Sequence, residues 1–413
     1  MWLTLAEDRA PATGLNKGRD RKRLGAGAVM GGIAQVDGHR DERIDFLRGV
    51  ALIFIFVDHV PESLLSLLTL QSYAFADAAE LFYFLSGYVA AMVYGRTVET
   101  RGALVATWQI WRRAWVLYIA QILLFVFLAA EVSLAVAGTG HASYHDDFRL
   151  GVFLAHPDTA IVHALLLRYQ PVYLDILPVY VLLLLAFPIV LFGLARNFWL
   201  VLVPSTALYI AVQVWAFTLH TFPNGEGWFF NPLAWQFLFV LGATLGHPRL
   251  KGRWTFLGNP RLLKGAMIFA GLAAALQIPE ALRMIWPHIP SLTPVPLPLD
   301  KSVLEPLRIA SFLALAIVAR RYVPAGAILA RTALGRAVIR CGQHSLHIFC
   351  LGVLLSAAGA IIAEETGHSF LVQFCISLAG IVILLAFARY LDGLRQGRFR
   401  LLNGLAPRGS QPA

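Results

Sequence analysis

Two residues of the first long apolar stretch have the types and the spacing that acid–base chemistry requires. Arg48 and His59 lie eleven positions apart, and three turns of an α-helix take about 10.8 residues. Both side chains are therefore expected on one face of a helix, about 16 Å apart along its axis. A guanidinium can hold an anionic group, and an imidazole can accept a proton from an alcohol. An ordinary boundary arginine and a histidine that hydrogen-bonds between helices would give the same spacing.

Three carboxylates within apolar stretches favour the chemical interpretation. Asp58, Glu80 and Asp175 are placed by the predicted topology in the outer half of the membrane. Each would cost about 2.5 to 3.5 kcal/mol at the centre of a membrane helix, so packing alone does not explain them. Ionisable residues at such depth usually face a water-filled cavity, although hydrogen bonding between helices is the alternative role. Because adjacent helix residues point about 100° apart, Glu80 or Asp175 is expected to orient His59, rather than Asp58.

Further polar residues are candidates for substrate binding on the outer side. Asn231, Trp235 and Gln236 begin another apolar stretch at a similar predicted depth. Arg308 begins an outer-side helix, where it could pair with Glu305 or bind an anionic group of a substrate.

Arginines on the predicted inner side could hold phosphate groups. Arg48, Arg112, Arg113 and the Arg-rich segment 320–340 lie at the cytoplasmic ends of the predicted helices. Charges that set topology and meet lipid headgroups are the alternative for most of them. Arg113 is favoured because it enters an apolar stretch.

The elements that must position these residues are membrane helices. The chain is 58% hydrophobic and only 14% charged, against about 25% charged in typical soluble proteins. This predicts an all-α, polytopic membrane helix bundle of about ten transmembrane helices. The expected spans are residues 46–68, 77–98, 111–137, 172–194, 198–219, 230–246, 262–278, 304–319, 341–363 and 371–391.

The distribution of charge predicts the topology. The net charge is +10, but the lysines and arginines gather in alternate connecting segments, as topology requires, and form no pattern typical of nucleic-acid binding. Both termini are therefore expected in the cytoplasm, with the protein multi-pass in the membrane. Residues 1–43 are expected to be a disordered basic tail, 44–395 the transmembrane domain and 396–413 a second cytoplasmic tail. The three cysteines are interpreted as small hydrophobic residues, and no metal site is predicted.

Six segments, in order from the first to the ninth predicted span, carry a family resemblance. They are residues 43–49 (RIDFLRG), 57–61 (VDHVP), 79–88 (AELFYFLSGY), 170–178 (QPVYLDILP), 230–242 (FNPLAWQFLFVLG) and 342–346 (GQHSL). Together they resemble the OpgC family, membrane enzymes that succinylate osmoregulated periplasmic glucans. That family is similar in turn to the membrane acyltransferase-3 group.

The resemblance implies an O-acyltransferase that uses acyl-CoA, with succinyl-CoA as the expected co-substrate and no permanently bound cofactor. It also implies a bacterial protein located in the cytoplasmic (inner) membrane. In the acyltransferase-3 group an Arg and a His with ten residues between them form the signature of the first helix, and Arg48 and His59 match it. His59 is then the catalytic base, and Arg48 helps to position coenzyme A. Asp58, Glu80, Asp175 and Gln236 match motif positions to which the family gives no individual roles.

Two other functions remain compatible with the sequence. One is a proton-coupled transporter or flippase of a sugar or lipid-linked oligosaccharide, which would use the same residues as a proton relay. The other is an O-acetyltransferase of a surface polysaccharide. The sequence does not decide between direct transfer and an acyl-histidine intermediate, and it does not fix the oligomeric state.

Overall fold

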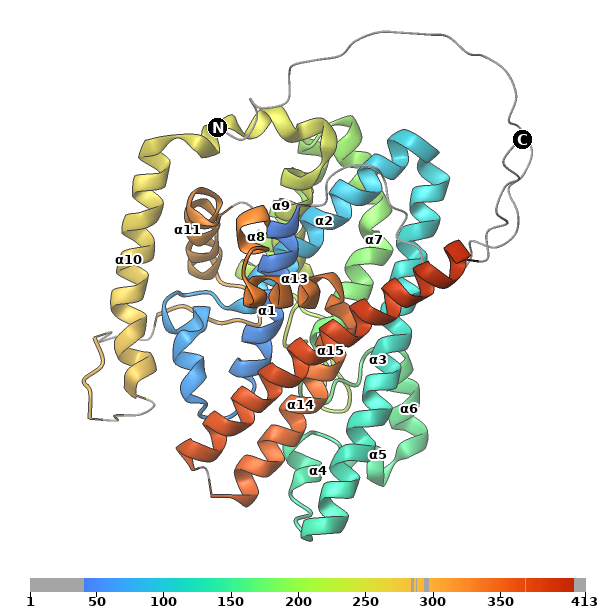
Figure 1. Ribbon diagram of the computed structural model, residues 1–413, viewed down its shortest axis with the longest axis vertical. Helices are drawn as coiled ribbons and strands as arrows, with labels where there is room; N and C mark the ends of the chain where they lie inside the picture. The colour runs from blue at the N-terminus through green and yellow to red at the C-terminus, as the bar shows by residue number, and fades with distance from the viewer. Residues whose placement is uncertain are drawn as a thin grey trace, which may run out of the picture. The chain divides into compact units, whose positions relative to one another are not determined.

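The computed structural model describes residues 41–404 apart from 284, 285, 287, 293–296, 325 and 368. In this part of the chain all regular elements are helices, and an isolated bridge joins His220 to Gly227 (Figure 1). The predicted all-α class is therefore confirmed for the described residues. Most of the predicted N-terminal tail lies outside them, as does the end of the C-terminal one.

Six helices are long and apolar enough to cross a membrane. They are α2 (Ala78–Arg101), α3 (Ala103–Thr139), α7 (Ile176–Arg196), α10 (Pro260–Arg283), α14 (Ser345–Glu365) and α15 (Phe370–Gly404, apolar as far as Arg395). Four shorter helices occupy the other predicted spans: α1 (Glu42–Asp58), α8 (Trp199–Trp215), α9 (Pro232–Gly246) and α11 (Pro306–Tyr322). Each predicted span thus contains a helix, while the count of ten crossings and the orientation of the termini stay predictions.

Short elements connect these helices. They are η1 (Leu64–Leu68), η2 (Leu70–Ser72), α4 (Tyr144–Asp147), α5 (Gly151–Ala155), α6 (Pro157–Leu165), η3 (Pro248–Gly258), α12 (Gly326–Leu329) and α13 (Ala333–Gln343). Helix α10 continues past the predicted span 262–278, through Pro279, and ends at Arg283. Part of the segment that follows lies outside the described residues.

Two predicted spans are interrupted, and both interruptions shape the site. The first was expected to run from 46 to 68, but α1 ends at Asp58 and 3-10 helices follow. Pro61, which has no N–H to donate, prevents the helix from continuing. The ninth, predicted for 341–363, begins in α13, breaks at His344 and resumes as α14. His59 therefore lies directly after the end of α1, and a new helix starts at Ser345.

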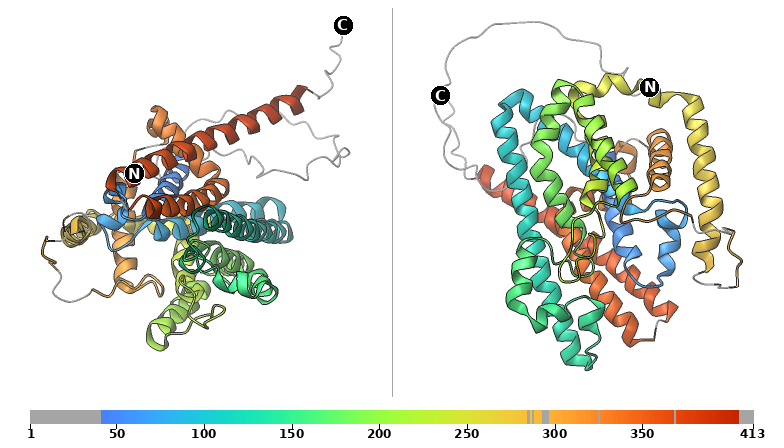
Figure 2. Two further views of the ribbon diagram at one scale, coloured as in Figure 1. Left: turned by 90° about the horizontal axis from the view of Figure 1, so that it is seen from below. Right: turned by 180° about the vertical axis from the view of Figure 1, so that it is seen from behind.

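Glycines allow the central helices to pack closely. A Cβ at Gly342 of α13 would overlap the carbonyl oxygen of Asp45 on α1, and one at Gly87 of α2 would overlap that of Phe239 on α9. Small residues permit such close backbone approach between membrane helices. Gly87 therefore forms part of a packing face between α2 and α9. Helix α10 stands to one side of the bundle, beside α11 (Figure 2).

Candidate active site

The ring of His59 is oriented by the main chain of its own helix. Its Nδ1 donates a hydrogen bond to the carbonyl oxygen of Ile55 at 2.5 Å. The edge of Tyr173 packs against the ring, with centroids 5.0 Å apart and an interplanar angle of 82°. Since a carbonyl can only accept, Nδ1 carries a proton, and in the neutral ring the lone pair is then on Nε2. The imidazole is therefore held in the tautomer that can act as a base through Nε2.

This arrangement corrects the expected partner of the ring. Glu80 or Asp175 was predicted to orient His59, but the Ile55 carbonyl does so. The Glu80 carboxylate is bound instead to Arg308. The helix end supplies an unused carbonyl four residues before the histidine, so no carboxylate is needed to fix the tautomer.

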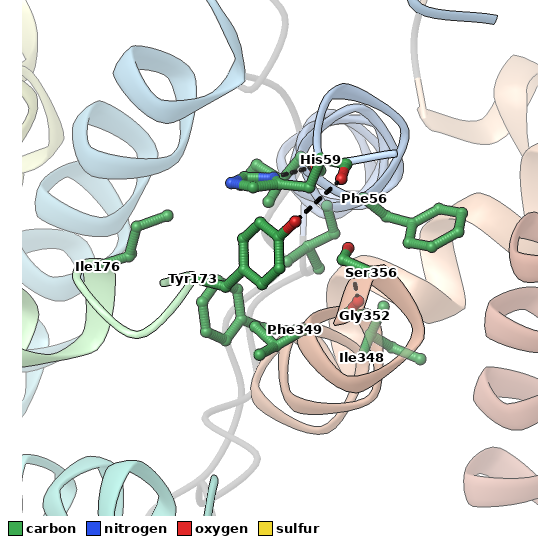
Figure 3. A pocket seen from close by; sticks show the side chains of 11 residues that line it. Phe56, His59, Tyr173, Ile176, Ile348, Phe349, Gly352 and Ser356 are labelled. Carbon is green, nitrogen blue, oxygen red and sulfur yellow. Dashed lines mark hydrogen bonds between the residues drawn. The ribbon is translucent and has the colours of Figure 1, made fainter. Parts of the chain in front are cut away.

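His59 lines a narrow cavity between α1, α14 and the segment before α7 (Figure 3). The other lining residues are Leu52, Ile55, Phe56, Tyr173, Ile176, Ile348, Phe349, Gly352, Val353 and Ser356. The cavity volume is about 10 Å³, which is room for about one water molecule. A larger ligand can therefore enter only if the surrounding helices move apart.

Arg48, in the first half of α1, contacts the same helix, α14. Its Nη2 donates to the hydroxyl oxygen of Ser345, the first residue of α14, at 2.7 Å. Further along α14, Ser356 lines the cavity of His59. Both residues of the predicted stripe thus face α14, with mainly apolar side chains between them. We call this shared face, from Arg48 and Ser345 to His59 and Ser356, the α1–α14 corridor.

The two neighbouring arginines of α3 differ in their surroundings. Arg113 is half-buried and close enough to His347 and Cys350 of α14 to act on them electrostatically. Arg112 is exposed. Arg113 therefore lies on the side of α14, whereas Arg112 lies on the surface, and their predicted role towards phosphates stays untested.

The carboxylate of Glu80 belongs to a buried cluster of charges. Arg308 contacts Glu80 Oε1 through Nη2 at 2.6 Å and Asp77 Oδ2 at 3.1 Å, and Lys301 Nζ lies 2.7 Å from the same Asp77 oxygen. Glu80 Oε2 also accepts the Asp77 N–H at 2.8 Å, which completes a capping box at the start of α2. We call Asp77, Glu80, Lys301 and Arg308 the outer ion-pair cluster. The suggested pairing of Arg308 with Glu305 is wrong.

The charge of Lys301 is maintained by its partners. Burial alone would lower its pKa, but the carboxylates of Asp77 and Glu80 outweigh this effect and raise it. The cluster therefore contains two cations and two anions that neutralise one another.

The predicted substrate-binding residues at the start of α9 form hydrogen bonds within the chain. Trp235 Nε1 donates to the Lys301 carbonyl at 3.0 Å, and Asn231 accepts the Leu233 N–H as the N-cap of α9. The Gln236 amide exchanges hydrogen bonds with Ser205. Their predicted role towards a substrate stays untested, but each is engaged within the chain.

The remaining carboxylates lie near the site without orienting the ring. Asp58 accepts a hydrogen bond from Gln71 Nε2 at 3.0 Å, so its neighbours differ from those of His59, as the helical angle predicts. Asp175 precedes α7 and lies close enough to Tyr83 and Lys301 to interact electrostatically with them. Their catalytic roles stay predictions.

Sequence reasoning did not identify four residues of these two regions. Asp77, Tyr173, Ser345 and Ser356 contact or neighbour the predicted residues. Only Asp77 had a local signal, because the pattern Asp77-x-x-Glu80 before an apolar run is typical of a capping box.

Comparison with known proteins agrees with the resemblance seen in the sequence. A family model described as OpgC protein matches residues 40–396, from the start of α1 into α15. The chain belongs to the OpgC family. Neither a curated protein nor a solved structure matches it. Together with the six apolar helices, this OpgC membership indicates a bacterial membrane protein with a transferase role that modifies glucans.

Proposed function

We propose that this OpgC protein is an O-acyltransferase. It moves an acyl group, succinyl in the first instance, from cytoplasmic acyl-CoA to hydroxyl groups of a periplasmic glucan. Family membership supports the class of acceptor. The chemistry rests on the structure of the α1–α14 corridor.

The single observation that carries the proposal is the state of the His59 ring. The bond from Nδ1 to the Ile55 carbonyl directs the basic Nε2 away from the helix, in a cavity shared with α14. Nε2 takes the proton of a sugar hydroxyl, and that oxygen attacks the thioester carbonyl. The carbon–sulfur bond breaks, and the coenzyme A thiolate takes the proton back from the imidazolium. Such base catalysis typically contributes about 10²- to 10⁴-fold to a rate.

The donor is proposed to enter at the Arg48 end of the corridor. Arg48, with Arg113 beside α14, offers cations for the phosphates of coenzyme A. The apolar side chains between Arg48 and His59 suit a thioester arm. Because the cavity has a volume of only about 10 Å³, donor binding requires α1 and α14 to separate locally.

The test is mass spectrometry of glucan incubated with the purified protein and either succinyl-CoA or acetyl-CoA. A gain of one succinyl mass per modification is expected, and it should disappear with His59→Ala. An acetyl mass, with no succinyl mass, would favour the acetyltransferase. No covalent change with either donor would reject an acyltransferase, and glucan uptake into vesicles would then point to a transporter. Near wild-type transfer by His59→Ala would reject the assignment of the base.

A further inference from the structure

A second, larger cavity lies beside the outer ion-pair cluster. It is bounded by α10, by η1 and η2 and by the segment before α2, and its volume is about 370 Å³. Small-molecule sites typically measure about 300 to 1,000 Å³. Its lining residues are Ser66, Leu67, Gln71, Ser72, Ala74, Ala76, Asp77, Gln277, Glu280, Ala281, Leu299 and Arg308. We call it the Gln71–Gln277 cavity.

The charges in this cavity are compensated within the chain. Arg308 is bound by both carboxylates of the outer ion-pair cluster, and Glu280 pairs with Arg283 at 3.1 Å. A ligand with several phosphates or a free carboxylate would find no uncompensated cation among the described residues that line this cavity. A neutral ligand rich in hydroxyl groups is the better match.

Two amide side chains provide the hydrogen-bonding capacity. Gln71 Nε2 donates to Asp58 at 3.0 Å, and Gln277 Nε2 donates to the Ala74 carbonyl at 3.2 Å. In the described part of the chain each amide uses one N–H in this way. The amide oxygen and the second N–H of each remain for a ligand, and together they can accept from and donate to neighbouring hydroxyls.

The cavity is linked to the His59 end of α1. Gln71 binds Asp58, the residue before His59. Lys301 and Asp77 act electrostatically on both Asp58 and His59. The cavity therefore lies near the proposed base and at the opposite end of α1 from Arg48.

We propose that the Gln71–Gln277 cavity is an anchoring subsite for one sugar unit of the acceptor glucan. A different unit of the same chain then presents its hydroxyl to His59. This inference rests on the proposed function for the identity of the acceptor. It adds a binding site that is separate from the α1–α14 corridor.

The test measures binding without any acyl donor. Short gluco-oligosaccharides are titrated calorimetrically into the purified full chain in detergent. Gln71→Leu and Gln277→Leu should each weaken binding about fivefold to tenfold, because each removes one or two hydrogen bonds to the ligand. Gln109→Leu, in α3, which contributes no residue to the described cavity lining, is the matched control and should bind like the wild type.

His59→Ala separates this proposal from the proposed function. It should bind gluco-oligosaccharides with unchanged affinity although it transfers nothing. In transfer assays Gln277→Leu should raise the KM for glucan and leave the KM for acyl-CoA unchanged. Binding by the wild type without any acyl transfer would reject the enzyme and keep the subsite. Unchanged affinity in both Gln→Leu variants, or no gluco-oligosaccharide binding by the wild type, would overturn the subsite.

Discussion

The α1–α14 corridor and the outer ion-pair cluster both contain ionisable side chains, but these side chains have different partners. In the cluster each carboxylate meets a cation, as when Arg308 contacts both Asp77 and Glu80. In the corridor the imidazole of His59 is bound to a main-chain carbonyl. Glu80 is fully buried, whereas His59 is half-buried beside a cavity.

This difference indicates a structural role for the outer ion-pair cluster and leaves His59 as the candidate for a reactive group. Charges removed from water are tolerated when opposite charges and hydrogen bonds satisfy them. The cluster joins α2, α11 and the turn at Lys301, so it fixes these elements relative to one another. A neutral imidazole needs no counter-ion and can gain and lose a proton. An ionisable residue in a membrane helix is therefore a site candidate only after its partners are known.

The largest expected effect is on catalysis, from His59→Asn. The asparagine amide can still donate to the Ile55 carbonyl, but it has no basic nitrogen. The rate of acyl transfer should fall about 10²- to 10⁴-fold, while the midpoint of thermal unfolding in detergent stays unchanged. The measurement is kcat with saturating acyl-CoA and glucan.

His156→Ala provides the control for that variant. His156 is exposed at the junction of α5 and α6, so its loss should leave kcat within about twofold, as is usual for surface substitutions. If His59→Asn retained wild-type kcat, His59 would not be the base, and its role would be structural, like that of the outer ion-pair cluster.

The next largest effect is expected on stability, from Glu80→Gln. Removing one member of a buried ion pair leaves Arg308 undercompensated, and this typically costs about 3 to 5 kcal/mol of the free energy of unfolding. Denaturant titration of the purified protein in detergent would measure it. The double variant Glu80→Gln, Arg308→Met should lose less than the sum of the single losses, because it no longer buries the unpaired charge. A fall in kcat at unchanged stability would instead make Glu80 catalytic.

The sequence predicted the positions of the helices because apolar stretches of sufficient length dictate them. Each of the ten expected stretches contains a helix. The interruptions at His59 and His344 were missed because hydropathy averaged over a whole span passes over short polar stretches such as Pro61-Glu62-Ser63 and Gly342-Gln343-His344. Yet these interruptions place the proposed base at a helix end, where a carbonyl is available to bind it.

The sequence indicated candidate residues for the site, but it did not indicate which side chains pair with one another. The spacing of Arg48 and His59 predicted a shared helix face, because helical periodicity is local, and in the structure both residues face α14. The partner of Arg308 lies 228 positions away in the sequence, and local rules say nothing about such distant contacts. For that reason Glu305 was an attractive but wrong partner.

A smaller effect is expected from Arg48→Ala, which tests the inner end of the corridor. Loss of a charged hydrogen-bond donor to a phosphate should raise the KM for acyl-CoA about tenfold to hundredfold. The KM for glucan should not change. Arg112→Ala is the matched control, since Arg112 is exposed on α3, and its KM for acyl-CoA should stay within about twofold. Equal effects of the two variants would mean that the inner arginines act only through their general charge.

The smallest effect is expected from Tyr173→Phe. The Tyr173 hydroxyl donates to the His59 carbonyl at 3.4 Å, which is long for such a bond, whereas the ring edge packs directly on the imidazole. Removing the hydroxyl alone should lower kcat less than about threefold, as expected for one weak neutral hydrogen bond. Tyr173→Ala, which also removes the packing that holds the imidazole, should lower kcat more and leave both KM values nearly unchanged. If Tyr173→Phe instead lost as much activity as His59→Asn, the tyrosine hydroxyl would take part in proton transfer, and the corridor would contain two reactive groups where we propose one.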